Sequence, residues 1–168
     1  EILKGYGENA QSKAFMRLFM LQAGLQYLVS AAILRINYND PKPVGIVTWL
    51  GLIIFVVGFL FESVADAQLA AFKRDPNNKG KILQSGLWKT SRHPNYFGES
   101  LVWLGLAIMS FGYPWGWLSL ISTAVITYLL LFVSGIPIQE KGKDQNPAWR
   151  EYASKTPRFV PFIGSKKI

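Results

Sequence analysis

The residues best suited to chemistry lie between Ser91 and Glu99, in the run Ser-Arg-His-Pro-Asn-Tyr-Phe-Gly-Glu, which holds the chain's only histidine. Proline fits the first turn of a helix and asparagine is a good cap, so a helix is predicted to begin near Pro94 or Asn95. A helix N-terminus offers free N–H groups and partial positive charge, which Arg92 and His93 would strengthen. These residues suit a phosphate site, and they suit a basic anchor at a membrane surface equally well.

A second polar group precedes this run. Glu62 and Asp66 are four residues apart, which places both carboxylates on one face of a helix that Asp75 and Pro76 should end. Carboxylates beside a basic segment suit a polar pocket, although acidic side chains at the end of a membrane span can also reach out to water. The Gly- and Lys-rich loop over residues 77–84 is longer than a connection between two helices requires, which favours a functional loop.

The C-terminal part carries a third polar group. Glu140 closes the last apolar run, and Asn146 with the following proline is predicted to cap and start a short helix. In that helix Trp149 and Tyr152 should share a side. The segment 157–162 is extended, aromatic and bounded by prolines, and we expect it at the membrane surface.

Long apolar segments must position these groups. The chain has 168 residues, of which 50% are hydrophobic, and its mean hydropathy is positive. About 20 apolar residues cross a hydrocarbon core. We therefore predict one all-α domain over residues 1–168, a polytopic membrane helix bundle with about four transmembrane helices whose cytoplasmic loops and tail form a cofactor pocket. The runs are Ala14–Leu34, Val44–Phe61, Tyr96–Phe111 and Trp115–Val133.

The distribution of cations predicts the orientation, because Lys and Arg gather in cytoplasmic loops. The segment between the second and third runs and the tail after the fourth are rich in Lys and Arg, whereas the opposite side has only Arg35 and Lys42. Four crossings then place the N-terminus, the middle loop and the C-terminus in the cytoplasm. The chain begins at Glu1 without a visible signal peptide, and we expect further helices to precede it in the full protein.

Composition also excludes several classes of function. The net charge of +8 lies beside membrane spans, so anionic headgroups and phosphorylated ligands are nearer partners than nucleic acid. The chain has no cysteine and one histidine, which argues against disulfides and against a metal site. The expected partners are the bilayer and a lipid-like small molecule; the oligomeric state is not predicted.

Three blocks carry a resemblance to a known family. They are Ser-Gly-Leu-Trp ending at Trp88, the Arg-His-Pro-Asn-Tyr block with Gly98 and Glu99, and Ala-Trp-Arg-Glu-Tyr ending at Tyr152 with two prolines after it. In order and approximate spacing, residues 61–162 resemble the C-terminal half of the steroid 5-alpha-reductase and sterol reductase superfamily. The resemblance implies a membrane helix bundle that binds NADPH at its cytoplasmic ends and takes a lipid-like substrate from the membrane.

The resemblance also implies site residues. Asp66 matches the helix-two aspartate of the 5-alpha-reductases, and Lys73 stands where relatives commonly have arginine, which keeps the charge but loses the bidentate fork. Arg92 and Lys73 are predicted to contact phosphates, and Asn95 and Asp66 the ribose or nicotinamide amide. The full set of predicted cofactor-binding residues is Asp66, Lys73, Trp88, Arg92, His93, Asn95, Tyr96, Glu140 and Tyr152.

The implied reaction is hydride delivery to a conjugated carbon–carbon double bond. In the 5-alpha-reductases the proton-donating pair lies on helices before the matched region, so we do not assign the catalytic acid to this chain. Isoprenylcysteine carboxyl methyltransferases share part of the signature and bind S-adenosylmethionine, but Asn95 and the tail block ending in two prolines resemble the reductases more. A non-enzymatic scaffold that kept the fold is a third alternative, and Lys73, Asp66 and Asn95 argue against it.

Overall fold

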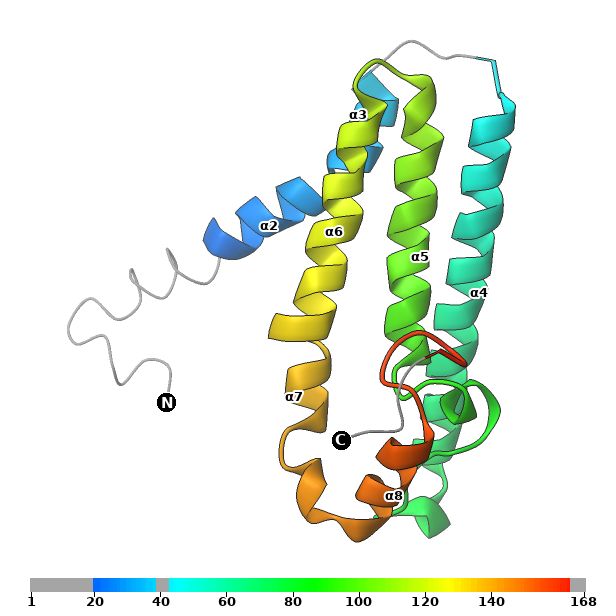
Figure 1. Cartoon of the computed structure of the whole chain (residues 1–168), viewed down its shortest axis with the longest axis vertical. Coiled ribbons are helices and arrows are strands. Elements are labelled where there is room, and N and C mark those ends of the chain that lie inside the picture. The colour runs from blue at the N-terminus through cyan, green and yellow to red at the C-terminus, as the bar shows by residue number, and fades with distance from the viewer. Residues whose placement is uncertain (1–19, 39–42, 164–168) are drawn as a thin grey trace, which may run out of the picture.

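The computed structural model describes residues 20–38 and 43–163, and every regular element in those ranges is helical. Three long helical columns stand side by side, and short helices and loops close one end of them (Figure 1). The helices are α2 (Leu21–Val29), α3 (Ala31–Tyr38), α4 (Ile46–Arg74), α5 (Pro94–Met109), α6 (Leu120–Tyr128), α7 (Ile136–Glu140) and α8 (Pro147–Lys155). The 3-10 turns are η4 (Pro76–Asn78), η5 (Gly86–Lys89), η6 (Ser110–Gly112), η7 (Gly116–Ser119) and η9 (Lys143–Gln145), and η8 (Leu129–Val133) is a π-helix.

Glycines bring α4 and α5 into close contact. A Cβ on Gly58 would lie 2.6 Å from the Val102 backbone N, and a Cβ on Gly98 would lie 2.5 Å from that of Glu62. The same close approach recurs seven residues away on each helix, where Gly51 of α4 faces Gly105 of α5. Small residues at this spacing let two backbones approach closely without a side chain between them. This close contact fixes where the start of α5 lies relative to the last turns of α4.

The third column is irregular near its charged end. It runs from Gly116 to Glu140 through α6, η8 and α7. At the π-helix the Leu129 carbonyl accepts hydrogen bonds from two backbone N–H groups, that of Ser134 at 2.8 Å and that of Gly135 at 3.3 Å. Here the chain departs from a straight helix, and α7 then begins at Ile136 with Pro137 in its first turn. The bend carries Glu140 to the start of α5.

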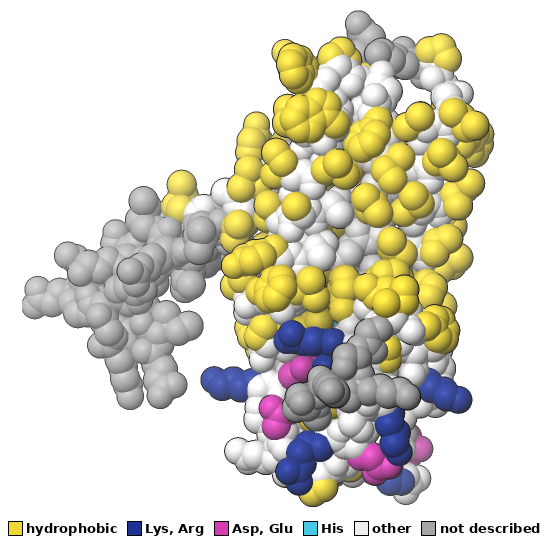
Figure 2. Space-filling view, in the orientation of Figure 1, with side chains coloured by type: hydrophobic (Ala, Val, Ile, Leu, Met, Phe, Trp, Pro, Cys, Tyr) yellow, Lys and Arg dark blue, Asp and Glu magenta, His cyan; other side chains and the backbone are white. Residues whose placement is uncertain are grey.

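Two helices in the described part of the chain are long and apolar enough to cross a membrane, α4 and the column Gly116–Glu140. Only 11% and 28% of their most apolar windows are buried, so they are not core helices of a soluble protein. Apolar side chains cover the upper part of the visible face and charged ones gather at the lower end (Figure 2). This pattern indicates a membrane protein. The count of about four spans stays a prediction, because α5 has 16 residues and α2 and α3 are shorter.

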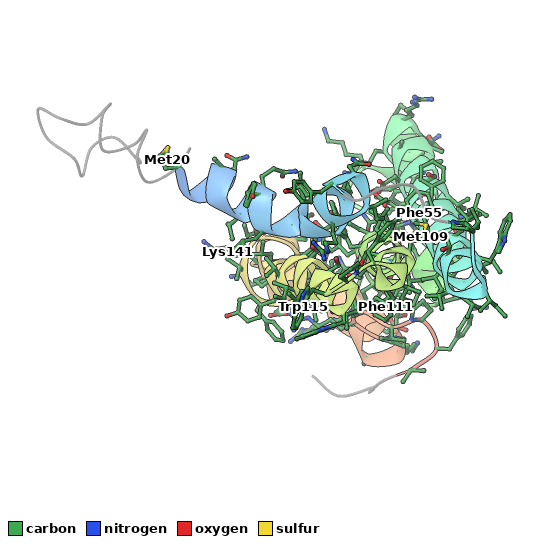
Figure 3. The ribbon with its side chains drawn as sticks, turned by 90° about the horizontal axis from the view of Figure 1, so that it is seen from above. Met20, Phe55, Met109, Phe111, Trp115 and Lys141 are labelled. Carbon is green, nitrogen blue, oxygen red and sulfur yellow. The ribbon has the colours of Figure 1, made fainter. Side chains whose placement is uncertain are left out.

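The first predicted span is not one continuous helix. Residues 14–19 of that run lie outside the described residues, and the remainder is α2 and α3, separated at Ser30. Ser122 of α6 holds the junction, since its Oγ donates to the Leu28 carbonyl at 3.2 Å and accepts the Ala32 N–H at 3.3 Å. Seen from above, α2 projects away from the bundle, with Met20 at its outer end, whereas Phe55 and Met109 lie together between α4 and α5 (Figure 3).

Candidate functional site

Helix α5 begins at Pro94, as predicted, and this start is deeply buried. His93 occupies the N-cap position, so the prediction that Asn95 could cap the helix is wrong. Asn95 lies inside the first turn, and its side-chain Nδ2 donates instead to Asp66 Oδ1 at 3.0 Å. The cause is tertiary: the close α4–α5 packing brings a carboxylate within reach of the amide, and a charged acceptor makes a stronger bond than a backbone group.

The Glu140 carboxylate contacts one histidine and two arginine side chains at the start of α5. Its Oε1 lies 2.9 Å from His93 Nε2 and 3.4 Å from Arg92 Nε, and its Oε2 lies 3.7 Å from Arg158 Nε. His93 is only 4% exposed, and burial lowers the pKa of its imidazole, although the Glu140 carboxylate acts in the opposite direction. The neutral imidazole therefore donates from Nε2 to Glu140 and keeps Nδ1 as an acceptor.

The C-terminal tail and helix α8 hold the loop before α5 in place. Tyr152 donates its hydroxyl to the Trp88 carbonyl at 2.5 Å, and burial raises the pKa of this tyrosine, which keeps it a donor. Trp88 in turn donates Nε1 to the Ala65 carbonyl of α4 at 3.0 Å. Ser91 Oγ donates to the Phe159 carbonyl at 2.7 Å. Trp88 and Tyr152 thus use their donors to fix the backbone around the site.

A cavity of about 680 Å³ opens beside the start of α5. Its walls come from the last turns of α4, the loop after it, the α5 start, the α7–α8 connection and α8. The cavity is large enough for an extended small-molecule ligand. Seven of the nine predicted site residues line it: Lys73, Trp88, Arg92, His93, Asn95, Tyr96 and Tyr152.

Asp66 and Glu140 do not line this cavity; they lie behind it. Each contacts lining residues, Asp66 through Asn95 and Glu140 through His93 and Arg92. In this arrangement the two carboxylates orient the groups that face the cavity, and the cofactor contact predicted for them stays a prediction.

The sequence reasoning missed several lining residues. Lys79, Lys81 and Lys143 line the cavity, and so does Trp149, over whose ring the Lys143 ammonium lies at 4.5 Å from the centroid. The two lysines of the long Gly- and Lys-rich loop could have been nominated from that loop's length and composition. No local pattern nominates Lys143, because it approaches Lys79 and Lys81 only when the chain after α7 folds back.

Three polar atoms around the cavity are buried without a hydrogen-bond partner among the described residues: Arg92 Nε, Asn95 Oδ1 and Trp149 Nε1. Arg92 Nε still lies within ion-pair distance of Glu140. Buried polar atoms are usually paired, so the unpaired Trp149 donor and the unpaired Asn95 acceptor at one cavity are a reason to expect a polar ligand there. The described residues contain no group of three or more His, Cys, Asp or Glu side chains placed to hold a metal ion.

Comparison with known proteins gives relatives that include named reductases and a named methyltransferase. The chain is 40% identical over 67 residues to "Steroid 5-alpha-reductase DET2" of Gossypium hirsutum (40% of this chain, 24% of the relative) and 23% identical over 171 residues to "Delta(14)-sterol reductase TM7SF2" of Mus musculus (89% and 38%). It is also 42% identical over 66 residues to "Probable O-methyltransferase ustE" of Ustilaginoidea virens (39% and 23%). The chain therefore spans less than two fifths of the length of these relatives. No solved structure matches the chain significantly.

Residues 1–156 match the family described as "Protein of unknown function (DUF1295)". This match covers most of the chain, including the start of α5, Glu140 with its partners Arg92 and His93, and all of α8. The resemblance to the steroid reductases that the three sequence blocks carry is confirmed by the reductase relatives. The chain belongs to the DUF1295 family.

Proposed function

We propose that this chain is part of a membrane reductase that uses NADPH to reduce a conjugated carbon–carbon double bond in a steroid, isoprenoid or other lipid. The observation that carries the proposal is the cavity at the α5 start, where Asn95 Oδ1 and Trp149 Nε1 are buried without a hydrogen-bond partner among the described residues. The relatives named as steroid and sterol reductases support it.

The residues at the cavity fit this cofactor. Asp66 can only accept, so it fixes Nδ2 of Asn95 toward itself and leaves Oδ1 free to accept a hydrogen bond. A ribose hydroxyl or a carboxamide N–H₂ is a donor that this oxygen would accept. Arg92 and the lysines of the lining supply positive charge for phosphates.

The chain's own part in the reaction is to bind and orient. NADPH would supply the reducing equivalent. The His93 ring is stacked on the Tyr96 ring, with centroids 5.5 Å apart and planes 5° from parallel, and the Glu140 bond prevents the imidazole from turning. This pair forms a flat, rigid wall beside Asn95. By the distribution of cations, the cavity and the C-terminus lie on the cytoplasmic side, and the substrate enters from the bilayer.

A methyltransferase that uses S-adenosylmethionine is the second candidate. The relative named as a probable O-methyltransferase favours it, since that match is 42% identical over 66 residues. Both candidates use the same cavity, so the bound nucleotide decides between them.

Titration of the purified chain with NADPH and, separately, with S-adenosylmethionine tests the proposal. We expect NADPH to bind and Asn95→Ala to weaken its binding by about tenfold, as for the loss of a buried hydrogen bond to a ligand, without changing the helical content. Gln84→Ala serves as a control, because Gln84 is an exposed amide in the nearby loop and does not line the cavity. Binding of S-adenosylmethionine alone would replace the reductase proposal with the methyltransferase.

A further inference from the structure

The chain after α8 ends in a turn that exposes large apolar side chains. This tail turn comprises residues 158–163, and within it the Ile163 N–H donates to the Val160 carbonyl at 3.3 Å. Pro161 is buried, whereas its successors Phe162 and Ile163 are 81% and 70% exposed. Val160 is also exposed. Adjacent large apolar side chains that the fold leaves uncovered are typical of a surface that binds a partner or a membrane.

Phe162 has a backbone conformation that a bulky residue rarely adopts. Its φ is 64°, in the left-handed region, which glycine and asparagine adopt more easily. Its N–H donates to the Thr90 carbonyl at 3.1 Å, so the loop before α5 fixes this conformation. The strain is thus present at a side chain that packs little against the described chain. Strained residues of this kind concentrate at sites that bind something.

The tail turn is connected to the wall of the cavity. Besides the bond from Phe162, the Arg92 N–H donates to the Pro157 carbonyl at 2.8 Å, immediately before the turn. Arg158 Nε lies 3.7 Å from Oε2 of Glu140, the carboxylate behind the cavity. Whatever holds the tail turn therefore also holds the loop that leads into α5.

An aromatic ladder joins the tail turn to the apolar part of the bundle. The Phe159 ring packs edge-on against Phe97 of α5 with centroids 5.8 Å apart, and Phe97 packs in the same way against Phe61 of α4 at 5.7 Å. Helix α4 is long and apolar enough to cross a membrane, and Phe61 lies within it. In Figure 1 the tail, drawn in red, turns back from α8 toward the long helices. The tail turn thus continues the surface that faces lipid.

We propose that the tail turn inserts Phe162 and Ile163 into the bilayer leaflet nearest the cavity, so that lipid holds the loop before α5 in place. Aromatic side chains favour the membrane interface, and cations beside them attract anionic headgroups. Arg158 precedes the pair, and Lys166 and Lys167 follow it in the sequence. This inference goes beyond the proposed function and does not depend on which nucleotide the cavity binds.

The depth of a spin label tests the insertion. The chain has no cysteine, so Ile163→Cys and the control Lys155→Cys each carry one label in nanodiscs of phosphatidylcholine and phosphatidylglycerol. Lys155 is an exposed position at the end of α8, eight residues earlier in the same tail. Oxygen concentrates among acyl chains and a nickel chelate stays in water. We expect oxygen to relax the label at position 163 more than nickel does, and the reverse at position 155.

Two results would overturn the insertion. Relaxation of the label at position 163 mainly by nickel would place the tail turn in water. Weak relaxation by both reagents would show that protein covers the pair, either a second copy of the chain or another segment of it.

Phe162→Asn and Phe162→Leu test whether lipid holds the loop. Asparagine adopts the left-handed conformation more easily than phenylalanine, so relief of strain alone would tighten the turn, whereas leucine keeps an apolar side chain. If insertion holds the turn, Phe162→Asn should speed hydrogen exchange at the Arg92 amide in the same nanodiscs by about tenfold, as for the loss of one apolar side chain from lipid. Phe162→Leu should change this rate much less. Unchanged or slower exchange in Phe162→Asn would overturn the proposal, because the bilayer would then not hold the loop.

Discussion

At the scale of single residues, His93 connects the cavity to the carboxylate behind it. The imidazole is buried, bonded to Glu140 and stacked on Tyr96, so it has little freedom to turn. Because burial lowers its pKa, the neutral form holds this arrangement at neutral pH. Protonation would place a second positive charge beside Arg92 in a buried position.

This residue predicts a pH dependence of stability. The pKa of His93 in the folded chain is below the ordinary value of about 6.5, so between the two values the unfolded chain binds more protons. The free energy of unfolding should therefore fall as the pH is lowered through about 6.5. Thermal unfolding followed by fluorescence at about pH 7.5 and about pH 5.5 checks this. His93→Gln keeps a donor for Glu140 but cannot take up the proton, so its Tm should fall less between the two pH values than the Tm of the unmodified chain. Equal losses in both proteins would show that His93 does not cause the effect.

At the scale of elements, the α4–α5 contact decides where the site residues meet. Asp66 lies near the end of α4 and Asn95 at the start of α5, and their hydrogen bond depends on the spacing that the glycines allow. A side chain in this interface would push the helices apart at the end that carries the site.

Gly98→Ala tests this dependence. The added Cβ would lie 2.5 Å from the Glu62 backbone N and 2.7 Å from the Gly58 carbonyl, and backbone atoms cannot move aside cheaply. We expect a destabilisation of about 1–3 kcal/mol, typical of overpacking, together with weaker NADPH binding. Gly24→Ala is the control, because no heavy atom lies within 4 Å of the added Cβ on α2. A Gly98→Ala protein as stable as the control would contradict the account of this interface.

The elements also show what the sequence could predict. The end of α4 before Asp75, the start of α5 at Pro94 and the Asn146 cap of α8 depend on local chemistry and are confirmed by the structure. The prediction that Asn95 caps α5 is wrong, because its side-chain amide donates to the Asp66 carboxylate, which lies 29 residues away in the sequence. The place of Lys143 in the cavity wall likewise depends on a long-range fold-back, which local patterns do not encode.

At the scale of the whole molecule, one end is apolar outside and the other is charged. The exposed side chains of α4 and α6 are largely apolar, and the cavity lies at the charged end with α8 and the loops (Figures 1 and 2). This division suits a protein whose cofactor comes from water and whose substrate comes from the membrane.

The division predicts the sidedness of α4. The chain has no cysteine, so a single introduced thiol reports one position. In intact cells a membrane-impermeant maleimide should label Val44→Cys, which is 62% exposed before α4, and should label Lys89→Cys only after permeabilisation. Labelling of both positions from the same side would contradict the predicted orientation.

Protection of a thiol at the cavity by NADPH tests the central claim most directly. Pro76→Cys places the thiol at an exposed lining position, and Ser85→Cys places it in the same loop away from the lining. With NADPH at about ten times its Kd, labelling of Pro76→Cys should slow by about tenfold and labelling of Ser85→Cys should not change. If NADPH leaves both rates unchanged, or S-adenosylmethionine alone slows labelling at Pro76→Cys, the cavity is not the NADPH site of a reductase.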